Sequence, residues 1–251
     1  MAFDIDGGVY DSIMTGNYSH NNYGTGYEFY TFDSSGIAWG NNTLSENISE
    51  NDGLGSGMSS VALGSASVPS KPFYIYNNTF YKSIYPSTND SYCFLANGFG
   101  SLTGYAAGTL IANNICDTGP GLGGVNKFVY MPYVANASGI SWKNNLWFGS
   151  AAGSTWRNAG GTYTSLAAWQ AAVGETGSLG SDPLLTAPGT GGTLSWTPSL
   201  GNGPQPGPTG YALGTGSPAH AAGANLTSSP YNFSIPSNYY GATWAPNIGA
   251  Y

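Results

Sequence analysis

An Asn pair flanked by β-forming residues recurs along this chain of 251 residues. The four clear copies are residues 37–44, 74–80, 110–116 and 140–147. The second Asn of each copy lies at position 42, 78, 114 or 145, so the steps are 36, 36 and 31 residues. A weaker copy at residues 13–19 carries Asn17, 25 residues before Asn42. A unit that recurs every 20–50 residues or so indicates a solenoid or a propeller.

Short β segments, Gly-rich turns and a recurring Asn together favour a parallel β-helix. In that fold the Asn at one corner of each coil can stack on the Asn of the next coil. The stacked amides then satisfy one another and the bent backbone. We therefore predict an all-β fold, a right-handed parallel β-helix, with its coils in residues 1–150. Further strand candidates are residues 27–32, 59–63 and 128–134.

The character of the chain changes near residue 150. Residues 164–174 predict one helix, with Thr164 or Ser165 as its N-cap and Gly174 as its stop. The stretch from residue 183 to the end holds ten of the fifteen prolines and no Asp, Glu, Lys or Arg. We expect residues 151–251 to form this helix and an irregular wrap or cap of the same domain.

Charge is scarce and unevenly spread. Charged residues make up 7 % of the chain, but aromatic residues make up 14 %, which argues against disorder. Residues 1–52 hold eight of the twelve carboxylates and no Lys or Arg, so nothing there could neutralise phosphates. We therefore expect no nucleic-acid partner. Because no apolar run approaches the length of a transmembrane helix, we also expect no membrane span.

The chain has two cysteines, Cys93 and Cys116. Cys116 lies in an expected strand and is interpreted as a small buried apolar residue, while a disulfide to Cys93 would form if the two lie on adjacent coils. No Cys/His spacing is typical of a metal site, so no metal ligands are predicted. The sequence begins within an expected strand, so we interpret it as the carboxy-terminal portion of a longer secreted protein.

Three carboxylates in the first two coils are the strongest catalytic candidates. Asp4 and Asp6 are two residues apart on one expected strand, so their side chains point to the same face. Their Cα atoms are then about 6.6–6.8 Å apart. Glu28 follows in the next coil and could lie beside them across a strand spacing of roughly 4.8 Å. Glycoside hydrolysis needs two flanking carboxyl groups, and crowding raises the pKa of one, as a general acid requires. In the alternative, Asp4 and Asp6 cap turns or bind Ca²⁺ and Glu28 is solvated.

Residues close to these carboxylates complete the predicted site. His20 is expected to shuttle a proton or donate a hydrogen bond to a sugar; a loop histidine bonded to its neighbours is the alternative. The predicted substrate-binding residues are Asn21, Asn22, Tyr23, Tyr27 and Tyr30. The tyrosines could offer stacking surfaces for sugars, or they could fill the core instead.

Two stretches resemble secreted bacterial proteins of the pectate-lyase-like superfamily. Residues 2–8 (AFDIDGG) and 16–27 (GNYSHNNYGTGY) resemble an FDIDGG…YNYSHDNDGxG stretch of glycosidase-like members. Many such proteins end in a series of short motifs. Similar motifs here are Trp169-Gln170, Asp182-Pro183-Leu184 and the segments 217–223 and 247–251. The sequence departs from the pattern at Asn21, where Asp is usual, and at His220 and Asn247.

This resemblance implies a right-handed β-helix that is secreted or extracellular, from a superfamily of lyases, hydrolases, epimerases and non-catalytic proteins. Lyases of this fold use Lys or Arg, which the acidic region lacks, so we expect hydrolysis of a neutral polysaccharide without a cofactor. One alternative is a non-catalytic surface or filament protein that associates end to end. A further alternative is a Ca²⁺-dependent lyase or a glycan-binding module.

Overall fold

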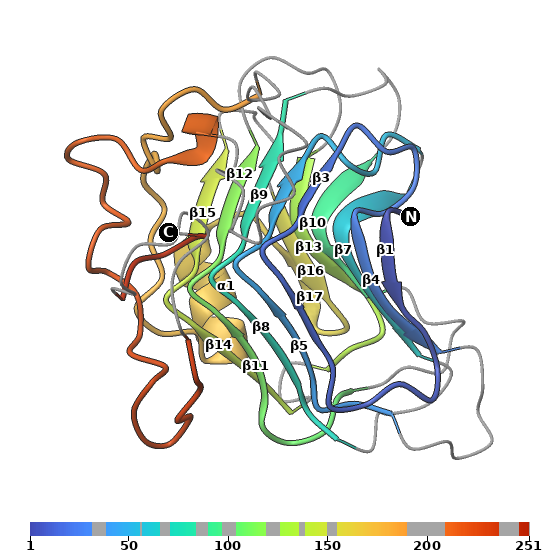
Figure 1. Cartoon of the computed structure of the whole chain (residues 1–251). Coiled ribbons are helices and arrows are strands. Elements are labelled where there is room, and N and C mark those ends of the chain that lie inside the picture. The colour runs from blue at the N-terminus through green and yellow to red at the C-terminus, as the bar shows by residue number, and fades with distance from the viewer. Residues whose placement is uncertain are drawn as a thin grey trace, which may run out of the picture.

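The computed structural model describes residues 1–31, 39–55, 57–65, 71–83, 90–96, 104–118, 126–135, 139–149, 155–189, 209–235 and 246–250. Within these residues the chain winds into stacked coils whose strands form three sheets (Figure 1). All strand pairs that link successive coils are parallel. The predicted fold class, a parallel β-helix, is therefore confirmed.

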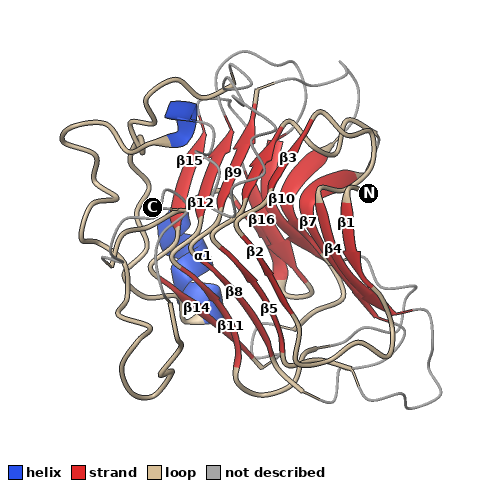
Figure 2. Cartoon of the chain, in the orientation of Figure 1, coloured by secondary structure: helices blue, strands red, loops and turns tan. Residues whose placement is uncertain are grey.

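The strands of all three sheets are drawn in red in Figure 2. Sheet I contains, in spatial order, β1 (Phe3–Ile5), β4 (Tyr27–Thr31), β7 (Met58–Ser65), β10 (Ser91–Leu95), β13 (Asn126–Met131), β16 (Thr155–Asn158) and β17 (Gly161–Tyr163). Sheet II contains β2 (Ile13–Thr15), β5 (Asn42–Ser45), β8 (Phe73–Tyr76), β11 (Thr109–Ala112) and β14 (Ile140–Lys143). Sheet III contains β3 (Tyr18–His20), β6 (Ile48–Glu50), β9 (Thr79–Lys82), β12 (Ile115–Thr118) and β15 (Leu146–Gly149). From β1 to β15 the strands follow one another in sets of three, one for each sheet, and β16 and β17 both extend sheet I.

The core fills the space between the three sheets. Because strand residues alternate between faces, inward side chains form columns along the solenoid, such as Tyr27, Val61, Phe94 and Val129 in sheet I. A disulfide joins Cys93 of β10 to Cys116 of β12, with a Cα–Cα distance of 6.1 Å. The bridge crosses the core between sheets I and III.

A row of asparagines runs along the corner between sheets II and III. Its members are Asn17, Asn47, Asn78, Asn114 and Asn145, separated by 30, 31, 36 and 31 residues. The Nδ2 of each donates to the Oδ1 of the next at 2.9–3.1 Å. The predicted stacking of amides is therefore present, and we call this row the Asn ladder.

The ladder does not include Asn42, so the predicted spacing of the first repeat was wrong. Asn42 lies at the start of β5, where its Oδ1 accepts from the backbone N of Ser12 and its Nδ2 donates to the carbonyl of Val9. Asn47 holds the ladder position instead. The residue before each ladder Asn is left-handed, and Glu46 (φ 56°) takes that place as Asn77 (φ 54°) does elsewhere. Ile37 and Ala38 of the predicted copy lie outside the described residues.

The predicted helix is confirmed as α1 (Leu166–Val173), which lies beside β14 and β17 in Figure 1. Ser165 is its N-cap and accepts from the backbone N of Ala168, and Gly174 ends it at φ 71°. Trp169 of α1 is buried against Trp142 and Trp156, so the helix packs on the last coil. Strands β16 and β17 continue sheet I past residue 150.

The carboxy-terminal segments run along the outer side of the solenoid (Figure 1). They include a short 3₁₀ helix, η1 (Thr209–Tyr211). Ala219 and Ile248 pack on Ile115 and Leu146 of sheet III, and Leu226 packs on sheet II. In the described part of the chain, no helix combines the length and the apolar character that crossing a bilayer requires.

Candidate functional site

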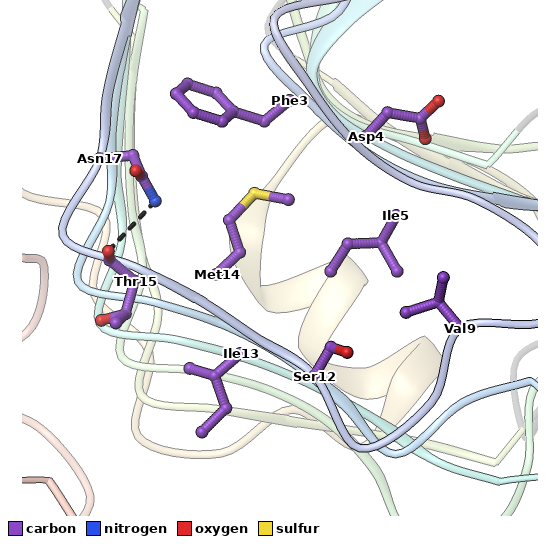
Figure 3. A pocket seen from close by; sticks show the side chains of 9 residues that line it. All are labelled: Phe3, Asp4, Ile5, Val9, Ser12, Ile13, Met14, Thr15 and Asn17. Carbon is purple, nitrogen blue, oxygen red and sulfur yellow. Dashed lines mark hydrogen bonds between the residues drawn. The ribbon is translucent and has the colours of Figure 1, made fainter.

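Asp4 and Glu28 lie side by side on the outer face of sheet I. They are register partners in the parallel strands β1 and β4, so their Cα atoms are about one strand spacing, roughly 4.8 Å, apart. Asp4 is exposed and Glu28 is half-buried. Figure 3 shows the Asp4 side chain directed away from Phe3 and Met14, which face the interior. We call Asp4, Asp6 and Glu28 the carboxylate patch.

The pKa values of the patch reflect its crowding. Burial raises the pKa of Glu28, and the charge of Asp4 raises it further, whereas the N-terminal ammonium lowers it. Burial raises the pKa of Asp4, and the charge of Asp6 adds to this effect. Asp4 and Glu28 therefore each hold a proton more readily than an isolated carboxyl group does.

Tyr30 borders the carboxylate patch. It lies two residues after Glu28 on β4, and the charges of Glu28 and Asp6 add to burial in raising the pKa of its hydroxyl. Its ring covers Gly64, its register partner on β7, where a Cβ atom would lie 1.9 Å from a ring carbon. Gly64 thus leaves the space in which the tyrosine ring lies flat on the sheet.

Aromatic and basic side chains gather farther along the same face. The rings of Tyr92 and Tyr130 stack with centroids 4.9 Å apart, and Lys127 Nζ lies 5.6 and 5.4 Å from them. Arg157 lies 5.4 Å from the ring centroid of Tyr130, and Lys127 forms an ion pair with Asp90. We call Tyr92, Lys127, Tyr130 and Arg157 the aromatic platform.

The platform and the carboxylate patch are aligned along one register row. Glu28 neighbours Ala62, Ala62 neighbours Leu95, and Leu95 neighbours Tyr130. Three strand spacings, about 14 Å in all, therefore separate Glu28 from Tyr130. The outer face of sheet I presents acids at one end and stacked rings at the other.

Sequence reasoning missed the aromatic platform. Lys127 and Tyr130 are three residues apart, and strict alternation would place them on opposite faces. They share a face because the register of β13 against β16 shifts between Lys127 and Val129. The Lys, Tyr and Arg residues were visible in the sequence, but only the bulge shows that they meet.

The structure separates His20 from the carboxylate patch. His20 ends β3 on sheet III, a different sheet, where its ring stacks on Tyr18 with centroids 4.9 Å apart. Its Nδ1 also lies 3.3 Å from the amide Nδ2 of Asn21. These contacts match the alternative of a histidine bonded to its neighbours, and the predicted assistance to Asp4 and Glu28 would have to come from a different sheet.

The predicted substrate-binding residues have different surroundings. Tyr27 is 1 % exposed, and its hydroxyl donates to the carbonyls of Asn17 and Ile48, so it belongs to the core and cannot present its ring to a sugar. The Nδ2 of Asn22 donates to Asp52 Oδ1 at 2.7 Å. Asn21 occupies a left-handed corner at φ 55°, and Tyr23 is 75 % exposed. Tyr30 is the predicted binding residue that borders the carboxylate patch.

Asp6 lies at the turn that follows β1. Its Oδ1 accepts from the backbone N of Gly7 at 2.6 Å, which is the turn-capping role considered for it above. It still acts electrostatically on the patch, because its charge raises the pKa of both Asp4 and Glu28. We therefore regard Asp4 and Glu28 as the reactive pair and Asp6 as a charged neighbour.

A pocket of about 410 Å³ opens on the inner side of the first coil. Figure 3 shows its lining, in which Phe3, Ile5 and Met14 present apolar side chains. Asp4 borders this pocket through its position on β1, but its carboxylate points to the other face. The pocket and the carboxylate patch are therefore separate features.

No group of three or more His, Cys, Asp or Glu side chains is placed to hold a metal ion in the part of the chain that the structure describes. The site is thus built from paired carboxylates and aromatic rings. Comparison with known proteins adds no family to this description: no model of a protein family matches the chain, and no curated protein is significantly similar to it.

Proposed function

We propose that this chain is an extracellular carbohydrate-active protein that hydrolyses a neutral polysaccharide along the outer face of sheet I. The register pairing of Asp4 with Glu28 carries the proposal. It supplies two adjacent carboxyl groups, which glycoside hydrolysis requires, and burial raises the pKa of Glu28, as a general acid needs. The aromatic platform supports it, because stacked rings offer flat surfaces to the C–H-rich faces of sugars.

The difference in burial between the two carboxyl groups would decide their catalytic roles. Glu28 is the more buried of the pair and would hold the proton as general acid, while Asp4 would act as nucleophile. In the first step Glu28 protonates the leaving glycosidic oxygen as Asp4 attacks the anomeric carbon. In the second step Glu28 takes a proton from water, which attacks the same carbon and releases Asp4.

The spacing of the pair favours retention of anomeric configuration. Neighbouring parallel strands lie roughly 4.8 Å apart, close to the carboxyl separation of about 5–5.5 Å that double displacement uses. Inversion needs a wider gap for water. The disulfide between Cys93 and Cys116 supports an extracellular location, because such bonds persist in oxidising compartments.

The test is hydrolysis of a panel of neutral plant and algal polysaccharides, measured as the release of reducing ends. Glu28→Gln and Asp4→Asn should each lower kcat by about a hundredfold or more. Asp11→Asn, which alters an exposed carboxylate at a corner of the same coil, is the matched control and should keep full activity. Activity that survives in both site variants would remove the pair from the mechanism.

A glycan-binding module is the second candidate. The aromatic platform favours this candidate, because the platform does not need the carboxylates to bind a sugar. Binding without hydrolysis that is lost in Tyr130→Ala but kept in Glu28→Gln would establish this candidate. End-to-end self-association and Ca²⁺-dependent lyase activity stay predictions, because no contact among the described residues tests them.

A further inference from the structure

A second pocket lies on sheet III, where the carboxy-terminal wrap crosses its outer face. Its volume is about 210 Å³. Three neighbouring strands, β9, β12 and β15 (Figure 1), supply register partners to its floor: Tyr81, Asp117 and Phe148. The wrap supplies Asp182, Leu184, Leu185 and Pro188.

Asp117 is the unusual residue of this pocket. Its side chain is 5 % exposed, and its Oδ1 has no hydrogen-bond partner among the described residues. Two other buried carboxylates accept hydrogen bonds within the fold: Glu50 accepts from the Tyr18 hydroxyl at 2.6 Å, and Asp52 accepts from Ser49 Oγ at 2.7 Å. Because buried polar atoms are normally hydrogen-bonded, the unpartnered Oδ1 of Asp117, in the lining of a pocket, points to a ligand that the fold itself does not supply.

Asp182 places a second carboxylate at the mouth of the pocket. It is exposed, and its Oδ1 accepts from the backbone N of Leu184 at 2.8 Å. Burial raises the pKa of Asp117 to about 7, and the charge of Asp182 contributes to this rise. The ion pairs within the described ranges are Lys71–Asp11 and Lys127–Asp90, so no basic side chain there compensates these two acids.

The walls of the pocket are aromatic and apolar. Tyr81 and Phe148 flank Asp117 on the two adjacent strands. Leu184 lies at the rim, 42 % exposed, in a left-handed conformation at φ 50° that is uncommon for a bulky residue. Hard cations such as Ca²⁺ need six or more oxygen ligands. An organic cation needs a counter-charge and ring faces instead, and this pocket offers both.

We propose that this pocket binds a small organic ammonium group, with Asp117 as its buried counter-charge, Asp182 at the mouth, and Tyr81 and Phe148 against its sides. The inference goes beyond the proposed hydrolysis and does not depend on it, because the pocket lies on sheet III and the carboxylate patch on sheet I. A free quaternary ammonium compound and an amino sugar both carry such a positively charged nitrogen.

The experiment measures binding to the full chain by calorimetry with two matched ligand pairs. Choline is compared with 3,3-dimethylbutan-1-ol, which has the same shape without the charge, and glucosamine is compared with N-acetylglucosamine. We expect the charged member of at least one pair to bind at least about tenfold more tightly than its neutral partner. The pair that responds distinguishes a free amine from an amino sugar.

Three outcomes would overturn the proposal. Equal binding of charged and neutral partners would show that charge is not recognised. The absence of saturable binding by either amine would show that the pocket does not take an ammonium group. Calcium chloride that binds when neither amine does would identify a metal site instead.

Variants locate the binding. Asp117→Asn keeps the side-chain shape and should weaken ammonium binding about tenfold, while circular dichroism checks the fold. Phe148→Leu should weaken it several-fold by removing a ring face. Asp11→Asn is the control with unchanged affinity. Unchanged affinity in Asp117→Asn would refute the assignment.

Binding should also depend on pH. Asp117 ionises as pH rises through about 7, so choline should bind more tightly at pH 8 than at pH 6. The groups that face Asp117 do not mask this effect: burial raises the pKa of the Tyr81 hydroxyl, which stays neutral, and Asp182 is the other acid. The Asp117→Asn variant should lose most of the pH dependence, and a full dependence in that variant would contradict the proposal.

Discussion

The Nδ2 of Asn145 donates to Oε1 of Glu175 at 2.9 Å, and this contact ends the Asn ladder. Glu175 lies 30 residues after Asn145, one further coil step. Its carboxylate also accepts from Trp147 Nε1 at 3.1 Å and from Ser178 Oγ at 2.6 Å. Burial raises the pKa of Glu175, while these hydrogen bonds lower it. A carboxylate thus terminates a row that asparagines alone would leave with unpaired donors.

Replacing Glu175 should therefore destabilise the last coil. Glu175→Ala leaves one Nδ2 hydrogen of Asn145 and the Nε1 hydrogen of Trp147 without acceptors, at about 1–3 kcal/mol each, while Asn145 Nδ2 still donates to the carbonyl of Ile111. Urea unfolding should show the loss. Glu175→Gln retains an acceptor and should lose less. If Glu175→Ala unfolds at the same urea concentration as the parent, the terminating role is wrong.

Asn47 should matter more to stability than Asn42. Asn47 accepts from the backbone and side-chain nitrogens of Asn17 and donates to Asn78 and to the carbonyls of Met14 and Ser45. Asn42 has one accepting and one donating contact, to Ser12 and Val9. Asn47→Ala should cost about 3 kcal/mol or more, and Asn42→Ala about 1–2 kcal/mol. Thermal melts of the two variants would decide, and the reverse order would contradict the observed ladder.

Lys82 should make stability depend on pH. Its side chain is fully buried, and burial lowers its pKa from 10.5 to about 7, although the charge of Asp52 opposes this. Between pH 7 and 10.5 the unfolded chain binds a proton that the folded chain does not. Stability from this group therefore rises with pH, by up to about 1.4 kcal/mol per unit in that window, and is lost as pH falls towards 7.

The comparison of the parent with Lys82→Met isolates this effect. Other titrating groups are shared, so the difference in unfolding free energy between the two proteins should change steadily from pH 7 to pH 9. The variant should be the more stable of the two at pH 7. Parallel pH profiles would mean that Lys82 keeps its ordinary pKa.

The disulfide should stabilise the middle coils. Cys93 and Cys116 are 23 residues apart, and closing a loop of this length is worth about 3 kcal/mol. The double variant Cys93→Ala/Cys116→Ala should lose roughly that amount in urea unfolding. Reduction of the parent should produce a similar loss, whereas no change on reduction would show that the bridge contributes little.

Local signals predicted what local interactions determine. Ser165 and Gly174 mark the ends of α1 because capping involves only neighbouring residues. The pairing of Asp4 with Glu28 followed from strand alternation and from the coil length. Asn78 was recognised because another Asn precedes it, but Asn47 follows Glu46 and so was overlooked.

The features that sequence reasoning missed depend on contacts between distant residues. The aromatic platform needs a bulge in β13, which alternation cannot reveal. Asp117 and Asp182 share a pocket because the wrap returns across sheet III, and no repeat or motif specifies that path. His20 lies on sheet III and not on sheet I with Asp4 and Glu28, because a corner of the coil separates residues that are close in the chain.

In the Asn ladder, successive coils are joined at the same corner by the same amide-to-amide hydrogen bond. Steps of 30, 31 and 36 residues all end in the same contact, so extra residues are accommodated between rungs without disturbing the cross-section. Whole turns are therefore interchangeable modules. Duplication or excision from one Asn to the next would lengthen or shorten the protein while every Asn before the terminating Glu175 contact still meets another Asn.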